Sequence, residues 1–200
     1  MTQKTAAAWR SRDPVTDPAF EARSRHDGLV DEMPDVPVMA SLQLEISGLG
    51  MILYSPSSAA HISEGEDYLT SSYWEPQDVQ HHVEQGYIVG FSTGSPGYYK
   101  LDIFRGYPAP DEFDEAEMKL RLVVRADERL VFRDLYDLME WSAVYPEPQA
   151  IDIDSGIYHV TVLSDIPASG TLGDHQTISI YLAQLPNFPP MRYSGVPSLC

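Results

Sequence analysis

A serine between two glycines is the first feature of this sequence that could carry chemistry. Residues 90–94 read Gly-Phe-Ser-Thr-Gly and match the G-x-S-x-G pattern, in which a strand, a tight turn and a helix expose a nucleophilic serine. Ser95-Pro96-Gly97 and another strand-like segment follow at once, so no helix can begin after the serine. The pattern therefore favours the approach to a hairpin turn over a catalytic Ser92.

Histidines give an equally weak signal for a metal site. His81 and His82 are adjacent, and on a strand their side chains would point to opposite faces, so they could not chelate one ion together. Neither His61 nor His175 completes a zinc motif such as H-E-x-x-H. We expect surface histidines and no metal.

One aspartate-rich turn resembles part of a calcium loop. Asp152, Asp154 and Gly156 have the residue types, but the distal bidentate glutamate and the regular ligand spacing are missing. Asp154-Ser155-Gly156 is also typical of a β-turn. We expect a turn here, and no cofactor anywhere in the chain.

Carboxylates dominate the chemistry of the chain. Its 200 residues contain 30 Asp and Glu against 13 Lys and Arg, a formal net charge of -17. Such a field repels nucleic acid and anionic membranes and attracts basic proteins. No pair of carboxylates has an apolar setting that would separate two pKa values for acid–base catalysis, and no phosphate-cradling glycine loop is present. These observations favour a binding protein over an enzyme.

Two acidic clusters stand beside aromatic residues. Residues 111–117 hold five carboxylates around a phenylalanine, and residues 64–67 hold three shortly before a Tyr-Trp pair. Such surfaces suit a basic, partly apolar partner, although a solvated loop and a buried tryptophan would explain any single residue more simply. Taken together, the clusters predict these partner-binding residues: Asp111, Glu112, Phe113, Asp114, Glu115, Glu117, Glu64, Glu66, Asp67, Tyr73 and Trp74.

The sequence also limits where the protein can act. Cys200 is the only cysteine, which excludes an intrachain disulfide. The first residues lack the apolar core of a secretion signal, and no segment approaches the roughly 18 apolar residues of a membrane span. We expect a cytoplasmic protein that contacts no membrane.

The chain divides into a proline-rich first part and a second part in which apolar and polar residues alternate. Residues 1–37 are repeatedly interrupted by proline and predict a flexible arm, with a short helix near residues 18–25. Residues 38–200 predict a single β-rich domain, because apolar residues alternate with polar ones. We expect hairpins across the turns at 47–50, 94–97, 126–128 and 154–156, an acidic loop at 111–117, and short helices near 76–84 and 134–141.

An internal repeat predicts how the strands combine. Residues 97–110 align without gaps on residues 156–169, matching Tyr99 with Tyr158, and the two copies extend over 97–124 and 156–182. A hairpin has one face to bury and cannot do so alone. We therefore predict a mainly β fold, an antiparallel β-sandwich or partly closed barrel built from two similar hairpin units that face each other, with one or two short helices.

The order of strand patterns from Trp74 onward resembles the ComJ-like competence nuclease-inhibitor family. The resemblance lies in Trp74-Glu75 with Gln85-Gly86-Tyr87, in residues 89–92 and 120–124, and in residues 151–162 with a closing strand at 178–182. With the first predicted hairpin it spans roughly residues 40–185. It implies a protein that binds and silences a DNA-degrading nuclease, a role that extends in bacteria to immunity proteins against nuclease toxins.

Three functional hypotheses follow. The first is an acidic inhibitor or immunity protein that neutralises a cytosol-acting nuclease toxin, because a nuclease holds phosphates in a cationic cleft that carboxylates can fill. The alternative is a β-sandwich that binds a small molecule or carbohydrate by stacking on Tyr98, Tyr99 and Trp74. A hydrolase that uses some of the many carboxylates is the third.

Overall fold

The computed structural model describes residues 37–48, 50–190 and 196–199. The expected arm at residues 1–37, apart from Pro37, and its helix near residues 18–25 lie outside the described residues. None of the helices in the described part of the chain has the length and apolar character needed to cross a membrane.

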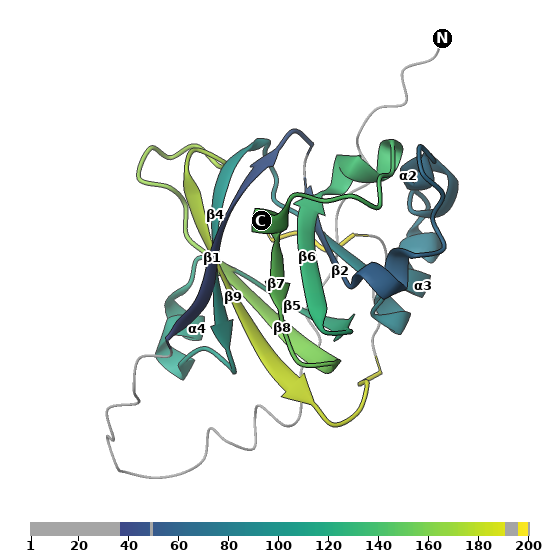
Figure 1. Cartoon of the computed structure of the whole chain (residues 1–200). Coiled ribbons are helices and arrows are strands. Elements are labelled where there is room, and N and C mark those ends of the chain that lie inside the picture. Colours follow the sequence, from purple (N-terminus) through teal and green to yellow (C-terminus); the bar gives the residue numbers. More distant parts are fainter. Residues whose placement is uncertain (1–36, 49, 191–195, 200) are drawn as a thin grey trace.

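Two β-sheets stacked face to face form the body of the protein (Figure 1). The larger sheet holds, in order, β1 (Val38–Ile46), β4 (Gly97–Arg105), β9 (Gln176–Leu185), β8 (Gly156–Ser164) and β5 (Met118–Ala126). The smaller holds β3 (Ile88–Ser92), β2 (Gly50–Tyr54), β6 (Arg129–Asp134) and β7 (Ala150–Asp152). The predicted mainly β sandwich is confirmed, but β4 and β9 pair in parallel, so the sheets are not wholly antiparallel.

Short helices cover the outer faces of both sheets. Helices α2 (Tyr68–Ser72) and α3 (Pro76–Gln85) lie beside the smaller sheet, and α4 (Pro110–Glu115) lies beside the larger one (Figure 1). Three 3₁₀ turns complete the set: η1 (Pro56–Ala59), η2 (Leu135–Met139) and η3 (Glu147–Gln149).

The helix predictions were partly correct. The helix expected near residues 76–84 is α3, whereas the one expected at 134–141 is the shorter 3₁₀ turn η2. The acidic stretch expected as a loop is in fact α4. Pro110 at its first position and two carboxylates in its first turn favour a helix start, because proline is preorganised there and acidic groups suit the positive end of the helix dipole.

Two apolar cores separate three layers. Between the sheets lie the inward residues of alternating strands, such as Tyr99, Leu101 and Ile103 of β4. On the other face of the smaller sheet, residues such as Ile52 pack with Val83 and other helical residues. The order of layers is therefore larger sheet, smaller sheet, then α2 and α3.

The turns that the sequence suggests for hairpins instead carry the chain from one sheet to the other. The connections β1–β2, β3–β4, β5–β6 and β7–β8 all join strands of different sheets. Strand β2 shows why the hairpin prediction was wrong: all five of its residues are buried, because the other sheet covers one face and the helices cover the other. If β2 paired with β1 in the larger sheet, one of its faces would be exposed, as one face of β1 is, and its apolar side chains on that face would lie in water.

The two copies of the repeat do not face each other. Strands β4 and β8 lie in the same sheet with β9 between them, and β4 does not pair with β5. Each copy nevertheless forms the same local hydrogen bond. The Tyr99 hydroxyl donates to the Ser95 carbonyl, and the Tyr158 hydroxyl donates to the Asp154 carbonyl, both at 2.7 Å. Each tyrosine thus fixes the corner where the chain enters the larger sheet.

Candidate functional site

Helix α4 is held against the outer face of the larger sheet by an aromatic pair. The Tyr181 ring projects outward from β9 and stacks on Phe104, with ring centroids 4.6 Å apart and planes at 11°. Its hydroxyl donates to the Glu112 carboxylate of α4. Burial, and then this carboxylate, raise the pKa of the Tyr181 hydroxyl above its usual range. The hydroxyl therefore stays protonated and keeps donating to the helix.

Phe113 fastens the other side of α4 to β5. The Lys119 Nζ lies 5.0 Å and the Arg121 Cζ 4.3 Å from its ring centroid. The Lys119 Nζ also donates to the Phe113 and Asp114 carbonyls, at 3.1 and 3.2 Å, where the helix ends. A cation at the carbonyl end of a helix stabilises it. Phe113, predicted as a partner-binding residue, is half-buried and helps to hold α4 on the sheet.

A pair of hydrogen bonds ties the end of α4 to the loop after β8. The Glu117 amide donates to the Asp165 carboxylate at 3.1 Å, and the Ile166 amide donates to the Glu117 carboxylate at 2.8 Å. Between α4 and this loop runs a groove of about 800 Å³. We call it the acidic groove, after the carboxylates that line it: Glu112, Glu115, Asp165 and Asp174.

The acidic groove continues onto an exposed carboxylate surface. Asp111, Asp114 and Glu115 of α4 are exposed, and none forms an ion pair with a described residue. Asp165 and Asp174 were missed by the sequence reasoning, because they lie 50 and 59 residues beyond the end of α4 and belong to no dense acidic run. Contact between distant segments brings these carboxylates together.

An accessible aromatic side chain lies next to the acidic groove. A second cavity, of about 490 Å³, shares His175 and Thr177 with the groove and is lined by Tyr98. Tyr98 is 55% exposed and stacks on His175, with centroids 5.9 Å apart. A hydrogen bond to the Glu45 carboxylate raises the pKa of its hydroxyl. Its neighbour Tyr99 is buried, so the expected pair of tyrosine platforms is wrong.

The carboxylates of the second acidic cluster, residues 64–67, accept hydrogen bonds from nearby backbone amides. Glu64 accepts from the Ala143 amide at 3.0 Å, and Glu66 accepts from the Ser63 amide at 2.9 Å. Asp67 accepts from the Thr70 amide at 3.0 Å and caps α2. These hydrogen bonds lower the pKa of Glu64 and of Asp67. Each of the three carboxylates therefore already has a local structural role.

The two aromatic residues near that cluster differ in exposure. Tyr73 is fully buried, and its hydroxyl donates to the Ile88 carbonyl at 3.1 Å, so its expected role as a surface anchor is wrong. Trp74 is 45% exposed. It lies between α2 and α3, on the opposite side of the sandwich from α4 (Figure 1). The two acidic clusters therefore do not form one continuous surface.

The residues considered for catalysis or metal binding lie in separate places, and His82 is buried, so the expectation of surface histidines was wrong for it. Ser92 ends β3, accepts a hydrogen bond from the Gly94 amide at 3.2 Å, and is followed by β4 and not by a helix. His81 and His82 lie on α3 and not on a strand, and their neighbourhood includes no group of three potential ligands within the described residues. Asp154 pairs with Arg105 at 3.1 Å.

Comparison with known proteins gives only distant structural likenesses. No protein-family model and no curated protein sequence matches the chain. Similar solved structures include one described as crocagin biosynthetic gene J, at 14% identity over 71% of this chain and 95% of that one, with a TM-score of 0.44. Another is ComJ of Bacillus subtilis, an inhibitor of the DNA-degrading activity of NucA, at 11% identity over 76% and 99%, with a TM-score of 0.42. At these TM-scores the likenesses say nothing about function, which the chain's own surface must indicate.

Proposed function

We propose that this protein is an acidic inhibitor or immunity protein that binds a basic nuclease through the outer face of its larger sheet. One observation carries the proposal: the acidic groove and the exposed carboxylates of α4 lie next to the accessible ring of Tyr98. A concentrated anionic surface with an aromatic contact is the complement of a cationic cleft built for phosphates.

The charge of the whole chain supports the same partner. A net charge of -17 steers a basic protein toward the surface, with association rates up to about 10⁸ M⁻¹s⁻¹ at low salt. Affinity must then come from a few well-packed contacts, because rim charges contribute more to the on-rate than to the final affinity. We assign that contact to Tyr98 with His175, which are already stacked before binding.

The rigid mounting of α4 favours recognition by shape. Tyr181, Phe113 and Lys119 hold the helix to the sheet, so its free carboxylates keep fixed positions. A preorganised surface loses less conformational entropy on binding than a mobile acidic loop would. Carboxylates fixed in this way can stand where the phosphates of a nucleic acid would sit.

The test is capture of the partner by matched variants. The full chain serves as bait in a lysate of its own cells, and captured proteins are purified and assayed for DNA cleavage with and without the chain. The binding variant is Asp111→Asn, Asp114→Asn and Glu115→Gln together. The control variant, Glu75→Gln, Glu84→Gln and Glu140→Gln, removes the same charge from exposed positions around α3 and η2.

We expect the chain to inhibit a captured nuclease at a 1:1 ratio, and association to slow steeply as salt rises. The binding variant should associate about tenfold more slowly at low salt, while the control variant should lose far less. Equal effects of the two variants would refute a local interface on α4. A captured partner without nuclease activity would refute the nuclease part of the proposal.

A further inference from the structure

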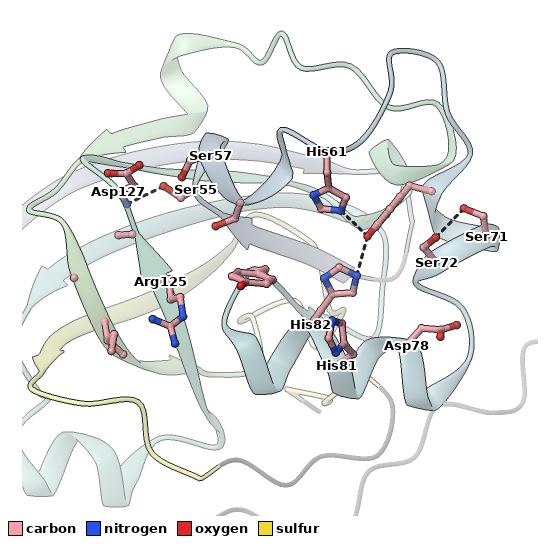
Figure 2. A pocket seen from close by; sticks show the side chains of 16 residues that line it. Ser55, Ser57, His61, Ser71, Ser72, Asp78, His81, His82, Arg125 and Asp127 are labelled. Carbon is pink, nitrogen blue, oxygen red and sulfur yellow. Dashed lines mark hydrogen bonds between the residues drawn. The ribbon is translucent and has the colours of Figure 1, made fainter.

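Another cavity, separate from the acidic groove and from the cavity lined by Tyr98, lies on the opposite side of the molecule from α4 and is lined by different residue types. It encloses about 930 Å³ between η1, α2, α3 and the ends of β5 and β8. Figure 2 shows Arg125 and Asp127 on one side and His61, His81 and His82 on the other. Serine hydroxyls from residues 55–58 and 71–72 and the Tyr87 ring complete the lining. This volume is in the range of sites for small molecules.

Arg125 presents a fixed and unneutralised guanidinium to this cavity. Its Nε donates to the Gln85 carbonyl at 2.7 Å, and the group lies over the Phe188 ring at 4.9 Å. It forms no ion pair with a described residue, whereas Arg105, Arg129 and Arg133 each contact a carboxylate. A guanidinium anchored through Nε keeps its two terminal nitrogens for bidentate binding of an oxyanion.

The opposite side of the cavity is an ordered chain of hydrogen bonds. The Tyr68 hydroxyl lies 2.9 Å from the His61 Nε2 and 3.0 Å from the His82 Nε2. Burial lowers the pKa of His82 to about 4, so it is neutral at pH 7. A backbone hydrogen bond to Ser72 opposes part of this shift and ties the imidazole to the end of α2. The Tyr68 hydroxyl thus links the two imidazoles, and the His61 ring lines the cavity beside it.

The acidic members of the lining suit hydroxyl groups. Asp78 and Asp127 both line the cavity, and the Asp127 carboxylate accepts from the Ser155 hydroxyl at 3.3 Å. Carboxylates repel a bare anion but accept hydrogen bonds from alcohols. The combination of one free guanidinium, carboxylates, serines and a half-exposed tyrosine ring therefore selects a molecule with both an oxyanion and several hydroxyls.

We infer that this cavity binds a small hydroxylated molecule that carries one phosphate or carboxylate group, such as a sugar phosphate or a sugar acid. The oxyanion pairs with the terminal nitrogens of Arg125. The hydroxyls bind the serines, His61 and Asp78, and the sugar ring lies on Tyr87. This site is independent of the acidic groove and of its protein partner.

Titration calorimetry on the full chain tests the site with three probes: glucose 6-phosphate, glucuronate and glucose. We expect saturable binding of at least one charged sugar, at least about tenfold tighter than glucose. Tighter binding of the first probe identifies a phosphate ligand, and tighter binding of the second a carboxylate ligand. Absence of saturation by both up to about 10 mM, or equal binding of glucose, would overturn the inference.

Variants locate the binding. Arg125→Gln should weaken the charged probe about tenfold or more, while Arg105→Gln, which removes the same charge outside the cavity, should not. Arg125→Lys keeps the charge but loses the forked guanidinium, so its affinity for the charged probe should lie between the affinities of those two variants. Tyr87→Ala should lower the affinity for every probe that binds. Thermal melting checks that each variant is folded. If Arg125→Gln is unfolded, Arg125→Lys and Tyr87→Ala decide the matter, and unchanged affinity in both rejects the site.

Discussion

The buried imidazole of His82 makes the stability of this protein depend on pH. The side chain is 5% exposed, lies on α3, and contacts Tyr68 through Nε2. Burial, and then the neighbouring His81 and His61, lower its pKa from 6.5 to about 4. The unfolded chain, where this imidazole has its ordinary pKa, therefore takes up a proton at a pH where the native protein does not.

The sign and size of the effect follow from that difference. Between pH 6.5 and pH 4 the unfolded state binds more protons than the native state, so the free energy of unfolding rises with pH and falls on acidification. The stability that His82 contributes is fully present above pH 6.5. About 2 kcal/mol is lost by pH 5 and about 3 kcal/mol by pH 4. That is a large part of the 5–15 kcal/mol typical of a folded protein.

Substitution His82→Gln isolates this contribution. The Gln amide can keep the bond to Tyr68 and cannot take up a proton. Urea unfolding followed by tryptophan fluorescence, from pH 7.5 to pH 4.5, should show wild-type stability falling by about 2.5 kcal/mol more than that of the variant. His175→Gln is the control, since that side chain is exposed and lies away from His82, so its variant should show the pH dependence of the wild type. Parallel curves for wild type and His82→Gln would refute the reasoning.

Three further predictions concern the fold. Gly97→Ala should lower the free energy of unfolding, measured in urea, by at least about 2 kcal/mol more than Gly65→Ala does. Both glycines have positive φ, but a Cβ on Gly97 would meet a backbone carbonyl at 2.1 Å, whereas a Cβ on Gly65 would meet no atom within 4 Å. Tyr99→Phe and Tyr158→Phe should each cost about 1 kcal/mol, since each loses one hydrogen bond, and unequal costs in the same assay would contradict their equivalent roles. Asp134→Ala should cost about 3 kcal/mol in thermal and urea unfolding, because three backbone amides that donate to it at 2.6–3.1 Å lose their acceptor, and a cost below about 1 kcal/mol would show that water replaces it.

Local patterns in the sequence located most of the elements. Alternation placed the strands, and the short helix expected near residues 76–84, where no strand period is visible, is α3. The same alternation correctly put Tyr99 and Tyr158 on the inward face of the larger sheet. These features can be read from the chain because the period of a strand or helix depends only on neighbouring residues.

The sequence could not determine which strands pair. An alternating strand has an apolar face, but its pattern does not specify the element that covers that face. Strands β1 and β2 are joined by a short turn and still lie in different sheets, because β2 needs cover on both faces. The same reason explains Tyr73, which reads as exposed beside Trp74 but packs under the helices.

Composition and alternation were enough to predict a β-rich, strongly acidic protein with a dense carboxylate run at residues 111–117. The packing of the layers makes this run a helix fixed against Tyr181, and it brings Asp165 and Asp174 to the same groove. It also places Arg125 across a cavity from the histidines. Sites of this kind depend on contacts between segments about 50 residues apart, and such contacts are set by how the layers pack, which no local pattern encodes.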